Sequence, residues 1–94
     1  MNIHGTKVCK AVTVSTAAIA LSTLGTRLGL VIRNNSVNTI YLGRDATVTT
    51  ANGFPLLSDE VLEDNDAYDS SFGEVDNWYA IAGTSSDVRV IEYI

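Results

Sequence analysis

The chain has 94 residues, of which 46% are hydrophobic and 18% are charged, and its formal net charge is −5. This length suits one domain with a modest core, and this composition excludes both a disordered chain and a charge-rich helical protein. The single cysteine, Cys9, excludes an internal disulfide framework, and we expect its thiol to be buried and unreactive.

The N-terminal segment superficially resembles a signal peptide, because Lys7 and Lys10 precede an apolar stretch. Serine and threonine residues interrupt that stretch, and it falls short of the roughly 18 uninterrupted apolar residues of a membrane helix, so we expect a soluble, uncleaved protein. Alternating Val and Thr residues instead predict a strand over about 7–14. Residues 17–22 suit a second short strand or one helical turn.

The segment LGLVIRNNSVNTIYLG at 28–43 predicts an antiparallel hairpin. Two runs of β-branched and apolar residues flank an Asn-rich stretch that favours a tight loop. Alternation turns Leu30 and Ile32 to one face, and Ile40 and Leu42 continue that inward set beyond the turn.

A turn and an interrupted strand follow the hairpin segment. Asn52 and Gly53 mark the turn, and Pro55, the only proline, excludes a central position in a sheet. The apolar residues around this proline are expected to anchor the loop by packing: Phe54, Leu56 and Leu57.

Residues 58–77 hold eight of the eleven acids. Two structures stay open for 59–66: a strand with loops, which we favour, and a helix capped by Ser58. Loop calcium is a weak alternative, because the EF-hand glycine and glutamate positions are not met around three candidate acids. These are Asp64, Asp66 and Asp69.

Residues 78–83 and 87–94 predict two strands around a turn at 83–86. Strands at intervals of about 8 to 12 residues with turn signals between them indicate an all-β fold. The sequence therefore predicts a small antiparallel β-sandwich or a jelly-roll-like barrel of about six to eight short strands. We expect residues 1–25 to form an N-terminal arm or edge strand and residues 26–94 to form the sandwich domain.

Charge is divided unevenly along the chain. Residues 1–44 hold five of the six basic side chains and no acid, whereas residues 45–94 hold all eleven acids. This division predicts one electropositive and one electronegative side, unless folding interleaves the two halves.

The sequence gives little support for catalysis or cofactor binding. The lone histidine, His4, lies near the N-terminus, so no Ser or Cys triad is expected. One cysteine and one histidine exclude a structural zinc site of four ligands within one chain. The chain is acidic and its basic half has Tyr41 as its one aromatic residue, which does not suit nucleic acid. We expect no enzyme, no cofactor, no metal, and neither a nucleic acid nor a membrane as partner.

Several motifs occur in a recognisable order over about residues 26–94. They are an Arg-Leu strand end, LVIRNNSVNTIYLG, VTTANGFPL, a polar spacer, WYAIA and DVRVIEY. This order resembles the small β-sandwich virion proteins of tailed bacteriophages. That family often has a Pro-Gly-Glu turn in the spacer, where this chain has Ser58, Asp59 and Glu60 after Leu57.

The resemblance implies a non-enzymatic virion protein that decorates or cements the capsid exterior through protein–protein contacts. Its partner would be the major capsid protein or another virion protein, and a homo-oligomer is expected, with a trimer favoured. The N-terminal arm would add a strand to a neighbour's sheet. The alternative is a tail or fibre accessory module that binds host carbohydrate. Candidate interface residues are basic and aromatic: Lys7, Lys10, Arg27, Arg33, Tyr41, Trp78 and Tyr79.

Overall fold

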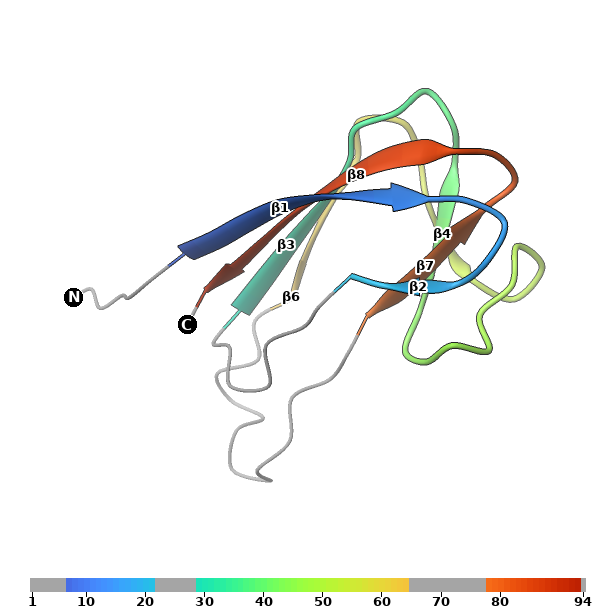
Figure 1. The fold of residues 1–94 in the computed structure, drawn as a ribbon, viewed down its shortest axis with the longest axis horizontal. Coiled ribbons are helices and arrows are strands. Elements are labelled where there is room, and N and C mark those ends of the chain that lie inside the picture. Colours follow the sequence, from blue (N-terminus) through green and yellow to red (C-terminus); the bar gives the residue numbers. More distant parts are fainter. Residues whose placement is uncertain (1–6, 22–28, 65–77, 94) are drawn as a thin grey trace.

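A computed structural model describes residues 7–21, 29–64 and 78–93, which form strands, turns and loops without a helix (Figure 1). The prediction of an all-β fold is therefore confirmed for this part of the chain. The strands are β1 (Lys7–Val14), β2 (Ile19–Ala20), β3 (Gly29–Asn34), β4 (Ile40–Gly43), β5 (Phe54–Leu56), β6 (Val61–Asp64), β7 (Tyr79–Ala82) and β8 (Ser86–Tyr93).

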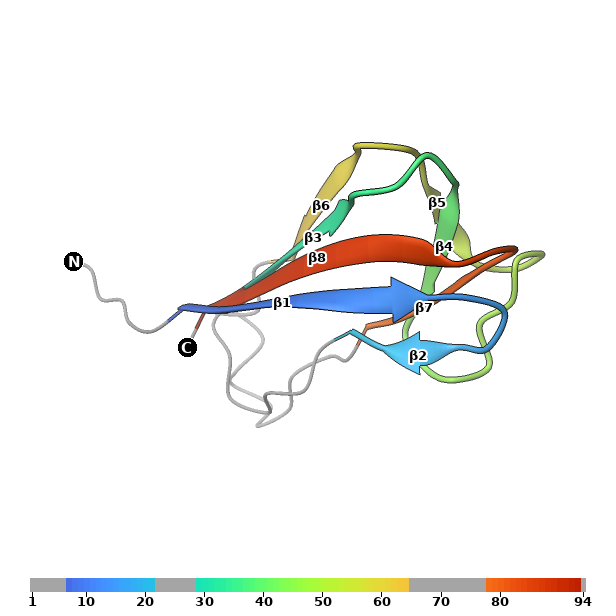
Figure 2. The same cartoon turned by 45° about the horizontal axis from the view of Figure 1, so that its top comes forward.

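The strands form two antiparallel sheets of four strands each. The first sheet has the order β1-β8-β3-β6, and the second has the order β2-β7-β4-β5 (Figures 1 and 2). The pairs β1–β8, β2–β7, β3–β6 and β4–β5 are those of one long hairpin that is folded at the β4–β5 connection and then rolled into two layers. This is the jelly-roll arrangement of a β-sandwich.

The predicted hairpin at 28–43 is wrong, because β3 and β4 lie in different sheets. The predicted inward set is confirmed, since Leu30, Ile32, Ile40 and Leu42 are all buried. Alternation identifies the face that a strand buries, but it does not identify the neighbouring strand. A corner between two facing sheets therefore has the same sequence pattern as a hairpin.

The corner between β3 and β4 is organised by the side chain of Asn34, which is fully buried. Its Nδ2 donates hydrogen bonds to the backbone oxygens of Asn38, at 2.7 Å, and Leu56, at 2.9 Å. Its Oδ1 accepts from the hydroxyl and the backbone N–H of Ser36, at 2.7 and 3.2 Å. The amide thus ties the loop to β5, and the Asn-rich stretch forms a corner in place of a tight turn.

The core lies between the sheets and consists of alternate residues from both layers. Its buried hydrophobic residues are Val14, Leu21, Leu30, Ile32, Ile40, Leu42, Leu56, Ala80, Ala82, Val88 and Val90. The sequence left a choice between strand and helix at 17–22 and at 59–66. Both segments contain a strand, β2 in the first and β6 in the second.

The loop-anchor prediction around Pro55 is correct for Leu56 alone. Leu56 is buried, but Phe54 and Leu57 are 62% and 51% exposed. The reason is that β5 is the edge strand of the second sheet, which also confirms that Pro55 avoids a central position.

The loop between β4 and β5 folds back over the outer side of the second sheet. Val48 in this loop is buried, and a Cβ placed on Gly43 would lie only 2.5 Å from the Cβ of Val48. A Cβ on Gly53 would lie 2.6 Å from the Cβ of Tyr41. Glycine at both positions allows the loop to approach the sheet closely, so the loop covers part of this side.

We expect Gly43→Ala to lower the free energy of unfolding by about 1 to 3 kcal/mol, because the new methyl group overpacks the contact with Val48. Gly83→Ala is the matched control, since no atom lies within 4 Å of a Cβ at that position. Urea denaturation of both variants measures the difference. Equal stability of the two variants would contradict the close packing of this loop.

Candidate interaction surface

The solvent-facing side of the first sheet is the most open β-surface among the described residues. Strand alternation and register place thirteen residues on it, and we call this set the outer face. The residues are Lys7, Cys9, Ala11 and Thr13 of β1, Asp87, Arg89, Ile91 and Tyr93 of β8, Gly29, Val31 and Arg33 of β3, and Val61 and Glu63 of β6.

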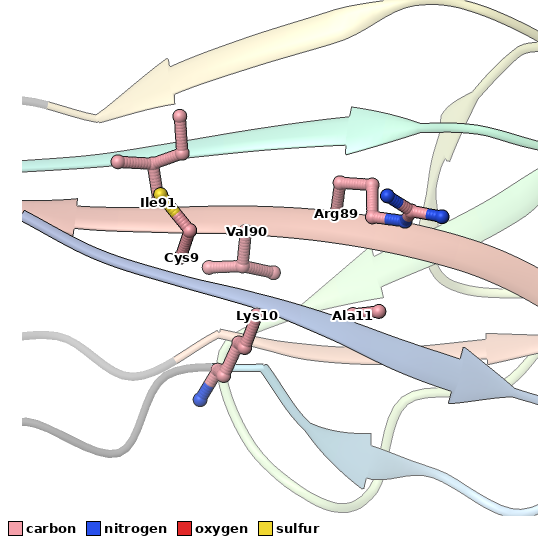
Figure 3. A pocket seen from close by; sticks show the side chains of 6 residues that line it. All are labelled: Cys9, Lys10, Ala11, Arg89, Val90 and Ile91. Atoms are coloured by element: carbon pink, nitrogen blue, oxygen red, sulfur yellow. The ribbon is translucent and has the colours of Figure 1, made fainter.

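A shallow, open hollow of about 350 Å³ lies along β1 and β8 (Figure 3). Cys9 stands opposite Ile91, and Ala11 stands opposite Arg89. The side chains of Cys9 and Ala11 are small, so the surface over β1 is lower than the surface over Ile91 and Arg89 on β8. The hollow has the size of one or two inserted side chains and no enclosed walls, so it suits a contact with another protein surface more than the capture of a small molecule.

Cys9 is exposed, so the expectation of a buried thiol is wrong. In β1 the valines at positions 8, 12 and 14 alternate with Lys7, Cys9, Ala11 and Thr13, and the second set faces solvent. The general preference of cysteine for burial was overridden by its place in this alternation.

Two arginines lie directly opposite each other on the outer face, Arg33 of β3 and Arg89 of β8. Each has a carboxylate close by. Arg89 donates from Nε and Nη2 to Asp87, with a shortest distance of 2.9 Å, and Arg33 Nη2 lies 3.3 Å from Asp59 Oδ1. These carboxylates offset the repulsion between the guanidinium groups.

Hydrogen bonds from Arg89 and then from Asn35 hold the pKa of the Asp87 carboxyl below its ordinary value of 3.8. Folding therefore favours the ionised form, and the resulting stabilisation is present above this value and is lost as the pH falls below it. We expect the melting temperature of the wild type to fall more steeply between about pH 5 and pH 2 than that of Asp87→Asn. Arg89→Gln should flatten the profile in the same way, and unchanged slopes in both variants would contradict the assignment.

The predicted interface residues do not share one surface. Lys7 and Arg33 lie on the outer face, whereas Tyr41 and Tyr79 lie on the opposite side of the molecule, on the second sheet. Lys10 and Trp78 occupy neither of these surfaces, because Lys10 has an inward position on β1 and Trp78 packs against the core. Arg27 lies outside the described residues.

Two acids form polar contacts at the inner side of the first sheet: Glu92, which the sequence analysis missed, and Asp64, which it considered only for calcium. Glu92 is fully buried, and its Oε1 lies 3.5 Å from Lys10 Nζ. Trp78 Nε1 donates to Asp64 Oδ2 at 2.7 Å, and the Arg44 guanidinium lies 4.1 Å from the centre of the Trp78 ring. Alternation gave a usable signal for Glu92, since it follows the inward Val88 and Val90 at the same period.

The two charge halves of the sequence are interleaved in the described strands. The jelly roll places β1 beside β8 and β3 beside β6, so strands of the basic half contact strands of the acidic half. The ion pairs Lys10–Glu92 and Arg33–Asp59 both cross between the halves. The described strands therefore mix the basic and acidic halves of the sequence and do not separate them into a positive and a negative side.

The predicted N-terminal arm includes β1 and β2, which are edge strands of the first and second sheets. β1 pairs along its whole length with β8 of its own chain, from Lys7 opposite Tyr93 to Val14 opposite Ser86. Its other edge has no strand beside it among the described residues.

Within the described ranges, no three side chains of His, Cys, Asp or Glu gather in a way that would hold a metal ion. Two of the three acids considered for calcium, Asp66 and Asp69, lie outside those ranges. The same part of the chain contains no helix with the length and hydropathy needed to cross a membrane. No family model, no curated protein and no solved structure matches the chain.

Proposed function

We propose that the chain is a non-enzymatic structural protein of a phage particle, which decorates or cements the capsid exterior through protein–protein contacts. The observation that carries the proposal is the outer face, an open β-surface with a shallow hollow along β1 and β8. The motif order that resembles phage virion proteins supports it. The jelly roll is compatible with it, because viral capsid and lectin domains use this fold, although a fold alone does not determine function.

The outer face has the composition of a protein interface. Small and aliphatic side chains occupy its middle, where Cys9 and Val31 flank Ile91 in register. Val61, which is 47% exposed, lies opposite Arg33 in the next outward-facing row, and the arginine–carboxylate pairs lie toward that end. Protein interfaces commonly combine an apolar centre with arginines and a polar rim. A capsid surface with a matching apolar ridge is the partner that we propose.

The first experiment locates the chain on the particle. Particles are purified from the source that encodes the chain and are imaged by electron cryomicroscopy. We expect density that fits the eight-stranded sandwich on the capsid exterior, with the outer face toward the capsid. Density on the tail alone would favour the alternative below, and absence of the chain from the particle would overturn the proposal.

A second experiment tests the surface itself. Val61→Glu places a charge on the outer face, and we expect it to weaken co-sedimentation with capsids that lack the chain by about tenfold or more. Val37→Glu is the matched control, because Val37 is 91% exposed in the β3–β4 loop, away from the outer face. Equal binding of the two variants would contradict the assigned surface, while normal melting temperatures show that both remain folded.

A carbohydrate-binding tail or fibre module is the second candidate, and the partly exposed Tyr41 and Tyr79 on the second sheet favour it. Trp78 is a poorer sugar platform than expected, since the Arg44 guanidinium stacks on its ring. Saturable binding on a glycan array that is lost in Tyr79→Ala would support this function. Binding to capsids without any glycan binding would exclude it.

A further inference from the structure

The four sheet edges differ in how easily another strand can join them. β2 has 2 residues, β5 has 3 and contains Pro55, and β6 has 4. β1 has 8 residues and no proline, and it lies at the border of its sheet in both views (Figures 1 and 2). An edge strand exposes a row of backbone N–H and C=O groups that can pair with another extended segment. β1 thus offers the longest such row among the described strands.

β1 lacks the features that usually protect a long edge. Its register with β8 runs without interruption, so no bulge bends the strand. Its solvent-facing residues after Lys7 are small and uncharged, Cys9, Ala11 and Thr13. Lys10 points between the sheets, where Glu92 lies 3.5 Å away, so its charge is compensated within the same chain.

We propose that two copies of this chain pair along β1, antiparallel about a two-fold axis, to form one continuous sheet of eight strands. A second copy is the occupant that the geometry favours, because an antiparallel pair of identical strands is symmetric and each copy presents the same edge, which no other described strand covers. A continuous sheet would also extend the outer face across both copies. This contact requires two-fold symmetry, so it builds a dimer and differs from the trimer expected from the resemblance.

Two conditions set the register of the pair: opposed residues must share a face of the sheet, and the Lys10 charges of the two copies must not be opposed. Residues directly opposite in an antiparallel pair share a face, so the two-fold axis passes through a residue. An axis at Lys10 would place the ammonium groups of the two copies opposite each other, which is unfavourable. An axis at Ala11 pairs Val8–Val14 of both copies and places Lys10 opposite Val12 of the second copy. Because β1 spans Lys7–Val14, axes at Lys10 and Ala11 are the two that pair the most residues, and charge selects Ala11.

Disulfide trapping tests this register, with Cys9 as the one native thiol. In an antiparallel pair, Cα atoms on the axis lie about 4.5 to 5.5 Å apart, within the range that a disulfide bridges. We expect rapid intermolecular crosslinking in Ala11→Cys combined with Cys9→Ser. The wild type should crosslink slowly, because its two Cys9 residues would be four positions out of register, about 13 Å apart. Thr13→Cys in the presence of Cys9 should crosslink again, since these two positions face each other in this register.

Light scattering on the full chain gives the oligomeric state, and a charge variant tests the axis. We expect the mass of two chains, and we expect Ala11→Lys to weaken the dimer by about three- to tenfold, because it opposes like charges on the axis. Thr13→Lys adds the same charge opposite Cys9 of the second copy and should weaken the dimer less. Within one chain Ala11 lies opposite Arg89 and Thr13 lies opposite Asp87, so the melting temperatures of the separated chains are measured for both variants, and dimer affinities are compared at a temperature at which both variants are folded.

Several results would overturn the proposal: a monomer or a trimer at all concentrations, or equal crosslinking of Ala11→Cys and of a control cysteine introduced at Val37. Fast crosslinking of the wild type would place the axis at Cys9 and overturn the register. The proposal does not depend on the function proposed above, because the dimer is measured with the purified chain and capsid binding with the particle.

Discussion

Asn34→Ala lowers the free energy of unfolding by about 2 to 4 kcal/mol, because it removes every hydrogen bond of a buried amide and leaves the buried Leu56 carbonyl without this donor. The amide is fully buried, and its Nδ2 donates to the carbonyl oxygens of Asn38 and Leu56. The Leu56 carbonyl lies on β5 in a buried place, where replacement by solvent is hindered, whereas the Asn38 carbonyl also accepts from Ser36 Oγ. A loss of this size would shift the melting temperature by roughly 10 to 20 °C in a domain of this length.

Asn34→Asp separates hydrogen bonding from shape. Aspartate has nearly the same volume, but its carboxylate cannot donate to the two carbonyls, and it places a charge in a buried position. We expect it to be at least as destabilising as Asn34→Ala at neutral pH. Asn35→Ala is the matched control, since the Asn35 side chain bonds to Asp87 in an exposed place. Urea denaturation at a fixed protein concentration gives the comparison, and a loss below about 0.5 kcal/mol in Asn34→Ala would contradict the assigned role of the corner.

Much of the fold could be predicted from alternation alone. The strand over 7–14 coincides with β1, and the inward residues around the corner, such as Leu30 and Leu42, are buried as expected. Alternation is a local signal, because successive side chains of a strand point in turn toward the core and toward water. It therefore locates strands and their buried sides without any knowledge of the partner strand.

The pairing of strands could not be predicted in the same way. β3 is hydrogen-bonded to β6 and β8, which are distant in sequence, while β4, the next strand along the chain, lies in the other sheet. The corner is stabilised by the buried hydrogen bond from Asn34 to Leu56, which is 22 residues away in sequence. Contacts of this range leave no periodic signal in a single sequence.

The candidate surface was predicted only in part. Lys7 and Arg33 lie on the outer face, but the sequence grouped them with Tyr41 and Tyr79 on the other sheet. Residue type was used there without strand order, and strand order decides which side chains share a face. Cys9 lines the hollow because of its outward position on β1, although its residue type suggested burial.

Lys10→Met lowers the free energy of unfolding by about 2 to 4 kcal/mol, because it removes the ammonium beside a fully buried carboxylate. The cost of breaking such a pair from one side exceeds the value of the pair itself, since the remaining charge stays desolvated. The Lys10 side chain is 25% exposed, so water replaces part of the lost interaction. Lys7→Met is the matched control on the same strand, where the ammonium lies 5.8 Å from the centre of the Tyr93 ring, and its loss should stay below about 1 kcal/mol.

A double-mutant cycle with Glu92→Met distinguishes the ion pair from simple loss of packing. If Lys10 and Glu92 act as a pair, the double variant should lose less than the sum of the single variants, with a coupling energy of about 1 to 3 kcal/mol. The coupling should persist at about 1 M salt, where screening removes most of the interaction between exposed charges, such as Arg33 and Asp59, whose side chains are 49% and 72% exposed. Additive losses would show that the two side chains are independent. In that case Glu92 would not neutralise the charge of Lys10, and that charge would oppose the pairing of two copies along β1.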